Sequence, residues 1–179
     1  MPRAYEPHSP EIDIAARRAA ATDAVLTPEL EDFCQSGLSV VIGVCAPGEA
    51  PIAGIGCGCR ILPDGRMRLF LMRSHNPSLL AVVERGGGVA ATFSWPITHR
   101  SIQIKGSRAA VAEPDDEDRD IAVMQHDRLR RDLVEINYSP AFSAAYCRVD
   151  PHDIVAIDFT PEAAFAQTPG PGAGAELKP

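Results

Sequence analysis

The stretch from Arg73 to Ser78 places polar side chains where an apolar strand is expected to run into a helix. Asn76 suits a helix cap and Pro77 the first helical turn. The free amides and the dipole of a helix start attract anions, phosphate above all. Arg73 and the Ser78 hydroxyl can bind the same anion, with His75 as a further donor when protonated. The stretch therefore predicts an anion site, the alternative being an ordinary helix start with Arg73 paired to a surface carboxylate.

A second group of polar side chains alternates with isoleucines in HRSIQIKGSR, residues 99–108. On a strand, this alternation places Ser101, Gln103 and Lys105 on one face and the isoleucines on the other. Arg100 stands at the mouth of the same strand. A cation, an amide and a lysine in a row suit an anionic ligand that carries a polar heterocycle. The alternative is an edge strand kept soluble by its charges.

The cysteines offer a weaker signal for metal binding. Cys57 and Cys59 lie two apart in GCGC, a spacing that points both thiols to one face of a strand. Zinc sites usually need a second ligand pair, and none is visible. We therefore interpret them as small buried side chains and expect no metal site. The odd total of five cysteines indicates reduced thiols.

The elements that must position these residues are mostly strands joined by short turns. Strands are expected at 38–46, 51–63, 66–73, 88–96, 99–113 and 147–159, and helices at 27–37, 76–86, 114–135 and 139–147. Glycines alternate within 51–63, which indicates a close approach by backbone or ligand, or the bending of a barrel strand. Because few helices separate the strands, the order favours an antiparallel sheet that closes into a small barrel. The expected class is mainly β, or α+β, with flanking helices.

Length and composition indicate one domain of ordinary globular character. The chain has 179 residues, of which 45% are hydrophobic and 23% charged. We expect a partly helical N-terminal extension over 1–26, the barrel over 27–160, and a disordered Pro/Gly/Ala-rich tail over 161–179. The net charge of −7 disfavours nucleic-acid binding. No apolar run is long enough to span a membrane and the first residues lack a signal-peptide core, so a cytoplasmic location is expected.

From TPELEDFCQSG to AAVAE, about residues 27–113, the chain resembles the FMN-binding split-barrel proteins related to pyridoxamine 5′-phosphate oxidase. The likeness lies in the order of the motifs along the chain. It extends more weakly to the closing strand RVDPHDIVAIDF. Its most specific part is FSWPITHRSIQIKG, which is similar to the strand, tryptophan, arginine and glycine-ended β-run of that family.

The resemblance implies a six-stranded antiparallel split β-barrel that forms a homodimer and holds FMN at the subunit interface. It implies that Phe70, Leu71 and Met72 face the flavin and that Arg73 and Ser78 serve its phosphate. A further set implied to line the site is Arg100, Ser101 and Gln103. An apolar flank left exposed by such a barrel is an independent reason to expect a twofold dimer.

Departures from the family pattern argue against pyridoxamine-phosphate oxidation itself. Leu79 and Leu80 stand where the oxidases carry a basic pair, and the closing strand lacks their tryptophan and arginine. We therefore expect a flavin-dependent oxidoreductase with another substrate, which the sequence does not name. The alternative is a non-catalytic dimeric barrel that carries or senses flavin, haem or another planar anionic ligand. A third hypothesis is a dimer with a purely structural role, which would bind no coloured ligand.

Overall fold

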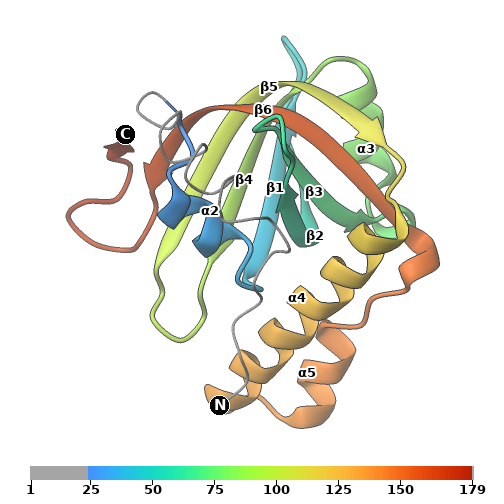
Figure 1. Ribbon diagram of the computed structural model, residues 1–179, viewed down its shortest axis with the longest axis vertical. Helices are drawn as coiled ribbons and strands as arrows, with labels where there is room; N and C mark the ends of the chain where they lie inside the picture. The colour runs from blue at the N-terminus through green and yellow to red at the C-terminus, as the bar shows by residue number, and fades with distance from the viewer. Residues whose placement is uncertain (1–23, 179) are drawn as a thin grey trace.

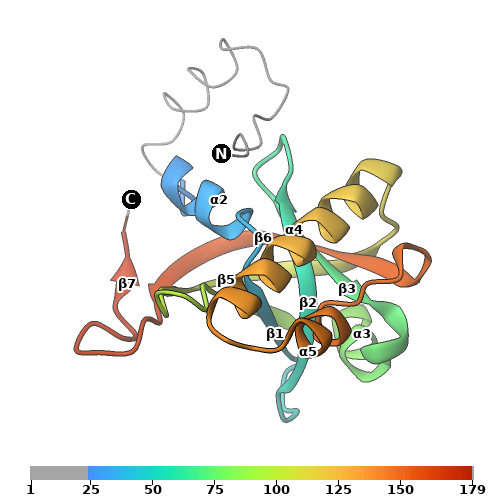
Figure 2. The same ribbon diagram turned by 90° about the horizontal axis from the view of Figure 1, so that it is seen from below.

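The computed structural model describes residues 24–178, and its main helices and strands are labelled in Figures 1 and 2. In chain order they are α2 (Pro28–Cys34), β1 (Ser39–Cys45), β2 (Ile52–Ile61), β3 (Met67–Met72), η2 (Arg73–His75), α3 (Pro77–Glu84), β4 (Gly88–Ser94), β5 (Ser101–Ala112), α4 (Asp116–Glu135), α5 (Pro140–Tyr146), η3 (Pro151–Asp153), β6 (Ile154–Ala166) and β7 (Glu176–Leu177). Most of the expected N-terminal extension lies outside the described residues.

The strands form one antiparallel sheet in the order β3-β2-β1-β4-β5-β6-β7, and pairing of β3 with β6 closes it. The first six strands therefore make a closed barrel, which confirms the fold class expected from the sequence. Inward residues of β1 such as Val40, Ile42 and Val44 are buried in the main core, while Val41 between them is exposed. This alternation is the pattern of a strand with one face on the core. No helix of the described residues is long and apolar enough to span a bilayer.

Local sequence signals explain where the helices begin. The Thr27 hydroxyl accepts a hydrogen bond from the Leu30 amide at the start of α2. Asp115 and Asp118 form a reciprocal capping box at the start of α4. Figures 1 and 2 show α4 and α5 side by side outside the barrel. Capping therefore fixes where α4 starts, and that start determines which of its residues face the strands.

A buried ionic cluster ties the first turn of α4 to the barrel. The carboxylate of Asp118 is fully buried and accepts from Arg68 at 2.7 Å and from Arg60 at 3.1 Å. Arg68 also binds Asp158 of β6, at 2.7 Å. The hydrogen bond to Asp158, followed by that to Asp118, raises the pKa of Arg68 above its ordinary value. These residues therefore hold α4, β3 and β6 in one arrangement.

The C-terminal segment differs from the expectation of a disordered tail from residue 161. Strand β6 continues to Ala166, where it pairs with Ile102 of β5, and β7 folds back to pair with Ala164 and Phe165. The long strand β5 supplies an edge that these residues extend. The Ala166 amide donates to the Ala175 carbonyl, and the Gly174 amide donates to the Ala166 carbonyl, which closes the return. The glycines and prolines of 169–174 thus form a turn between two paired segments. The boundary at 160 was too early.

The closing strand also begins later than expected. Residues 147–153 hold the end of α5, a loop and η3, and β6 starts only at Ile154. Asp150 caps the short η3 turn by accepting from the His152 amide. This segment runs beside α4, where the Arg119 side chain donates to the Pro151 carbonyl at 2.7 Å. It forms one wall of the cavity described next.

Candidate functional site

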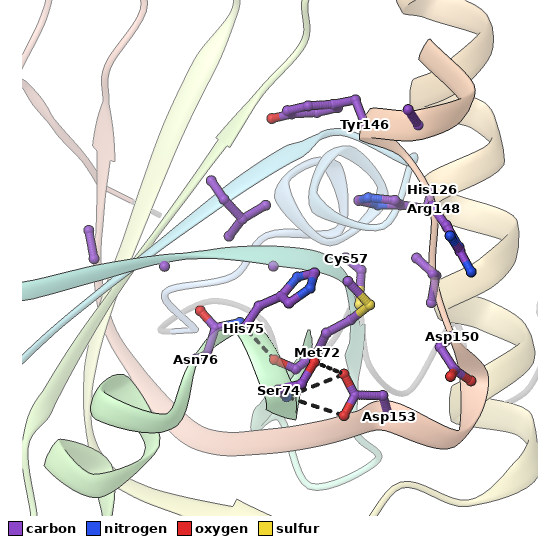
Figure 3. Close-up of a pocket in the computed structure, with 16 residues that line it drawn as sticks. Cys57, Met72, Ser74, His75, Asn76, His126, Tyr146, Arg148, Asp150 and Asp153 are labelled. Atoms are coloured by element: carbon purple, nitrogen blue, oxygen red, sulfur yellow. Dashed lines mark hydrogen bonds between the residues drawn. The ribbon is translucent and has the colours of Figure 1, made fainter. Parts of the chain in front are cut away.

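A cavity of about 880 Å³ lies between β2, the corner where β3 meets α3, and the helices α4 and α5 (Figure 3). Its walls come from segments far apart in the sequence. The residues that line it include Ala53, Ile55, Cys57, Met72, Ser74, His75, Asn76, His126, Tyr146, Arg148, Asp150 and Asp153. The volume falls within the range that small-molecule and cofactor sites occupy in proteins.

The glycines of β2 allow neighbouring side chains to approach the strand. A side chain at Gly54 would collide with the Asn76 amide, and one at Gly56 would press on Val40 and Ile42. Gly58 has φ +144 and would meet the Gln125 amide at 2.5 Å. The glycine row is therefore explained by close approach within the protein, together with the bulge between Gly56 and Gly58.

The bulge also separates the two cysteines of GCGC. Cys57 packs with Phe70, Ile121 and other residues beneath α4, whereas Cys59 packs in the main core. Both thiols are buried, as interpreted from the sequence, but the strand does not present them together. Burial raises the pKa of Cys57 to about 12, so the thiol that lines the cavity stays protonated near neutral pH.

Beyond the bulge, β2 loses its β1 neighbour and α4 takes over as partner. The Gln125 side chain accepts from the Cys59 amide at 2.9 Å and donates to the Cys59 carbonyl at 2.7 Å. Gln35 accepts similarly from the Ile61 amide. Both main-chain groups of Cys59 are thus satisfied although the adjacent strand has ended. This contact sets the distance of α4 from the floor of the cavity.

The corner between β3 and α3 is held by side-chain hydrogen bonds. Asn76 stands at the cap position, but its side chain makes no cap bond and donates instead to the Met72 carbonyl at 2.9 Å. The Ser74 hydroxyl donates to Asp153 at 2.5 Å, and the Ser74 amide also faces that carboxylate, as the dashed lines in Figure 3 show. His75 projects from this corner towards the cavity. The corner is therefore rigid, and Asp153 is already engaged.

His126 of α4 is the least satisfied polar group in the wall. The residue is 5% exposed, and its Nδ1 is the one buried side-chain polar atom of the described residues without a hydrogen-bond partner. Burial lowers the pKa of His126, and a hydrogen bond to the main chain of Cys57 partly opposes that effect. The ring is therefore neutral near pH 7.

Tyr146 and Arg148 come from the end of α5 and the loop after it. Figure 3 shows the Tyr146 ring edge-on, lying across one side of the cavity opposite the corner with His75. Arg148 is the one arginine among the residues that line the cavity, and Asp150 and Asp153 lie in the same wall. The cavity is thus mixed in charge and not strongly basic.

Three predicted site residues lie along β3. The side chains of Phe70 and Leu71 are fully buried in the two apolar clusters, so only their main-chain atoms can meet a ligand. Met72 lines the cavity. Of the two residues assigned to the phosphate, Arg73 pairs with Glu113 at 2.7 Å and Ser78 is exposed on the first turn of α3. Met72 thus reaches the cavity, and Arg73 is its immediate neighbour.

The other three predicted residues lie elsewhere in the chain. Arg100 pairs with Glu29 at 2.7 Å and lies over the Phe33 ring, beside a second cavity of about 820 Å³. Ser101 donates to the Ser94 hydroxyl, and Gln103 donates to the Thr92 hydroxyl. Both partners lie on the neighbouring strand β4, so these polar groups satisfy one another across the sheet.

The chain does not bring Arg73 and Arg100 together, and the strand pairing explains why. Met72 pairs with Ile154 at the start of β6, and Ile102 pairs with Ala166 at its end. A strand of 13 residues spans about 40 Å. The two arginines therefore lie towards opposite ends of the barrel, and one subunit cannot place both on the same phosphate.

Sequence reasoning missed His126, Tyr146 and the ionic cluster at Asp118. One signal was available: within the amphipathic helix α4, Asp118, Gln125 and His126 fall on the face that also carries buried Ile121, Ala122 and Leu129. Polar residues on an apolar helix face are buried, and buried polar groups need partners. The spacing did not show what those partners are.

Comparison with known proteins bears on the fold. No family model matches the chain, and no curated protein matches it. Among solved structures, Group A Streptococcus HupZ is 13% identical, with 83% of this chain and 99% of that chain covered and a TM-score of 0.50. A Clostridium acetobutylicum protein related to general stress protein 26, of the pyridoxinephosphate oxidase family, is 12% identical over 84% and 92% of the chains, with a TM-score of 0.47. An F420 reductase is 14% identical over 78% and 98%, with a TM-score of 0.48. At these identities the likeness concerns the fold alone, and of these three only HupZ reaches a TM-score of 0.50.

Proposed function

We propose that this protein binds FMN in the cavity between β2, α4 and α5 and uses it for oxidation and reduction, as a homodimer. The observation that carries the proposal is the cavity itself: about 880 Å³, with a glycine-rich strand as floor and the Tyr146 ring on one side. A narrow strand floor and an aromatic wall suit a flat ring system. When bound, the flavin would supply the hydride or electron transfer, and the chain would bind and orient it.

The dimer is supported by an exposed apolar face that borders the cavity. Val41 is 41% exposed and Ile55 is 51% exposed, and the two are cross-strand neighbours on β1 and β2. Ile55 also lines the cavity. Exposed apolar surface of this kind usually marks an interface, and twofold dimers are the commonest solution. A second copy on this face would cover the open side of the cavity.

The same face offers a role for the residues of β5. Val41 pairs with Thr92, and Thr92 pairs with Gln103, so the Gln103 side chain lies on the outer face that Val41 occupies. Ser101 is on that face too, and Arg100 precedes it. In the proposed dimer, these three residues meet the ligand only as contributions of the second subunit. One subunit then supplies Met72, Arg73 and Ser78, and its partner supplies the other group.

The phosphate is the part of FMN that the single chain fits least fully. Arg148 lines the cavity, while Arg73 is half-exposed and engaged with the exposed carboxylate of Glu113. Exposed ion pairs of this kind contribute only about 0–1 kcal/mol. Arg73 can therefore exchange Glu113 for a phosphate at the start of α3, where Ser78 is exposed.

Titration of purified protein with FMN and with riboflavin tests the proposal. We expect a yellow complex that absorbs near about 450 nm, with FMN bound more tightly than riboflavin. Replacing Arg73 by Ala should weaken FMN about tenfold and leave riboflavin unchanged, because only the phosphate contact is lost. Arg85→Ala is the matched control, since Arg85 is 50% exposed like Arg73 and pairs with Glu49 at 2.7 Å. Failure of both flavins to bind would overturn the proposal.

The dimer has its own test. Ile55→Arg should convert the protein to a monomer in light scattering, since it puts a charge at the centre of the apolar face. Arg108→Glu, a charge change at an exposed residue of β5 with positive φ, is not expected to alter the mass. A monomeric wild-type protein would contradict the shared site.

A carrier or sensor of haem or another planar ligand is the second candidate. It is favoured by the two histidines of the cavity, His75 and His126, because haem iron takes a histidine as an axial ligand. A sharp violet absorption band on addition of haem, with no flavin uptake, would support it. Reduction of bound flavin by a nicotinamide cofactor would instead support the oxidoreductase.

A further inference from the structure

Three polar side chains in the wall of the cavity are not used by the fold. His75, the Tyr146 hydroxyl and the Arg148 guanidinium line it, and none of them makes a hydrogen bond or an ion pair within the described part of the chain. All three residues are exposed, so a ligand in the cavity can reach them. Each can donate a hydrogen bond, and the arginine carries a fixed positive charge. The open polar groups of the cavity therefore suit an anionic ligand.

Arg148 stands apart from most arginines of this protein. Among residues 24–178, only Arg108, Arg128 and Arg148 have guanidinium groups without a hydrogen bond, an ion pair or a ring contact. Arg108 borders neither cavity, and Arg128 lines the second one. Arg148 is thus the one unpaired arginine among the residues that line the candidate site. A ligand can use its charge without breaking a contact of the protein.

The acidic residues nearby indicate which kind of anion fits. Asp153 accepts from Ser74, and Asp150 accepts from the His152 amide, so both carboxylates already have partners. They do not pair with Arg148, but they line the same cavity, and their charges act on any ligand that does. Two carboxylates repel a dianionic phosphate about twice as strongly as a singly charged ligand, because the Coulomb energy scales with the charge. The wall therefore favours a ligand with a single negative charge.

Arg148 also lies away from the place proposed for the phosphate of FMN. Figure 3 shows Arg148 on one side of the cavity and Asn76, the residue before α3, on the other. The phosphate is assigned to Arg73 and Ser78 near the start of α3, so Arg148 is left for another anion. The volume of about 880 Å³ lies towards the upper end of the range of small-molecule sites, about 300–1,000 Å³, which leaves room for a second small molecule beside a flavin ring.

We infer that a small organic acid with one carboxylate and a flat ring binds in this cavity beside the flavin, with the carboxylate on Arg148 and the ring against Tyr146. The inference rests on the proposed function, since it names the second molecule of the same site. Arginine binds a carboxylate through two parallel hydrogen bonds. The Tyr146 ring is 44% exposed and stacks on Phe142 at 5.9 Å and 17°, which fixes an aromatic surface for the ring of the acid.

The role of the charge is tested with benzoate and benzamide, which share a ring and differ in charge. In calorimetric titration of the FMN-loaded protein, benzoate should bind about tenfold more tightly than benzamide. Arg148→Leu should bind the two with equal affinity. Arg128→Leu is the matched control, because Arg128 is likewise unpaired but lines the other cavity, and it should keep the preference for benzoate. A thermal melt of each variant checks that it is folded.

The role of the ring is tested separately. Tyr146→Leu should weaken benzoate and benzamide alike, by about fivefold, because the aromatic surface is lost while the charge of Arg148 remains. Tyr138→Leu is the matched control: Tyr138 is 48% exposed and stacks on the other side of Phe142, but it does not line the cavity. It should change both affinities less than about twofold. Wild-type affinities in Tyr146→Leu would overturn the placement of the ring.

The outcomes separate this inference from the proposed function. If FMN binds but benzoate binds no better than benzamide, the inference is overturned while flavin binding stands. If FMN does not bind, yet the flavin-free protein prefers benzoate and loses that preference in Arg148→Leu, the proposed function falls and the acid site stands. Tighter binding of phenyl phosphate than of benzoate would overturn the assignment to a single negative charge. Loss of the preference for FMN over riboflavin in Arg148→Leu would show that Arg148 serves the phosphate, which also overturns the inference.

Discussion

Among the three buried polar side chains of helix α4, Asp118 and His126 lie about two turns apart, and their surroundings differ sharply. Asp118 accepts from Arg60, Arg68 and the Asp115 amide, so its carboxylate is fully engaged. His126 is almost as deeply buried, but its Nδ1 has no partner. Both lie on the face of α4 that packs against the barrel. A buried polar group whose hydrogen bonds are satisfied stabilises the fold, and an unsatisfied one costs stability.

The comparison also separates two kinds of arginine. Arg68 is 17% exposed and bridges two buried carboxylates, whereas Arg73 and Arg100 are 50% and 42% exposed and pair with exposed glutamates. The sequence drew attention to the exposed pair because each lies beside a strand end. Burial cannot be read directly from the sequence. It identifies Arg68 as structural, whereas Arg73 and Arg100 can exchange their partners.

The largest effect is expected from Asp118→Asn. It leaves Arg60 and Arg68 facing an uncharged amide in a buried position, and breaking a buried ion pair in this way typically costs about 3–5 kcal/mol. It also weakens the capping box of α4. Urea unfolding followed by circular dichroism measures the loss. Glu117→Gln removes an exposed partner of Arg60 and should cost less than about 1 kcal/mol. Equal losses in the two variants would mean that burial does not distinguish these carboxylates.

A smaller loss is expected from Gln125→Leu, which keeps the volume of the side chain but removes both hydrogen bonds to Cys59. The amide and the carbonyl of Cys59 would then be buried without partners, at a cost of about 2–3 kcal/mol. Gln35→Leu is the matched control: Gln35 gives β2 one hydrogen bond, to the Ile61 amide, in a less buried place. Unfolding by urea should therefore rank Gln125→Leu well above Gln35→Leu, and the reverse order would show that α4 does not act as a strand partner.

His126→Leu should change the stability of the ligand-free protein by no more than about 1 kcal/mol. The substitution removes an unpaired nitrogen along with the contact to the Cys57 main chain, so gain and loss nearly cancel. The same urea experiment measures it. A loss as large as that of Asp118→Asn would mean that His126 has a structural partner, and the contrast between these two positions of α4 would disappear.

Much of the fold could be predicted from the sequence. The apolar runs of the strands and the short turns between them are local signals, and they give the first six strands and the helices between them in the right order. The end of the chain was harder. Its glycines and prolines look like a disordered tail, and only the unpaired edge of β5 and β6 makes them a turn that leads to β7. Pairing of that kind depends on distant residues.

The candidate site was predicted only in part, for the same reason. The corner from Met72 to Asn76 does border a cavity, and its position at a strand end is a local feature. The prediction that Arg73 and Arg100 line one site assumed that the two side chains lie close together. Because β3 and the start of β5 pair with opposite ends of β6, the two arginines lie towards opposite ends of the barrel. His126 and Tyr146 lie on α4 and α5, the helices that follow the first five strands in the sequence. The order of the residues alone does not indicate that these helices border the same cavity as β2.

The smallest predicted effect is a pH dependence that belongs to His126 alone. Burial lowers its pKa in the folded protein below the ordinary value of 6.5, so as the pH falls the unfolded chain takes up this proton first. Stability is therefore fully present above about pH 6.5 and declines below it, until the folded protein is protonated as well. Cys57, His75, Arg148 and Asp150 border the same cavity, so the informative quantity is the difference between the wild type and a variant that lacks the His126 imidazole. Urea midpoints at about pH 7.5 and 5.5 should fall more for the wild type than for His126→Leu, which has no imidazole to protonate. An identical decline in the two proteins would show that the His126 ring titrates as freely when folded as when unfolded, which a buried, unpaired imidazole cannot do.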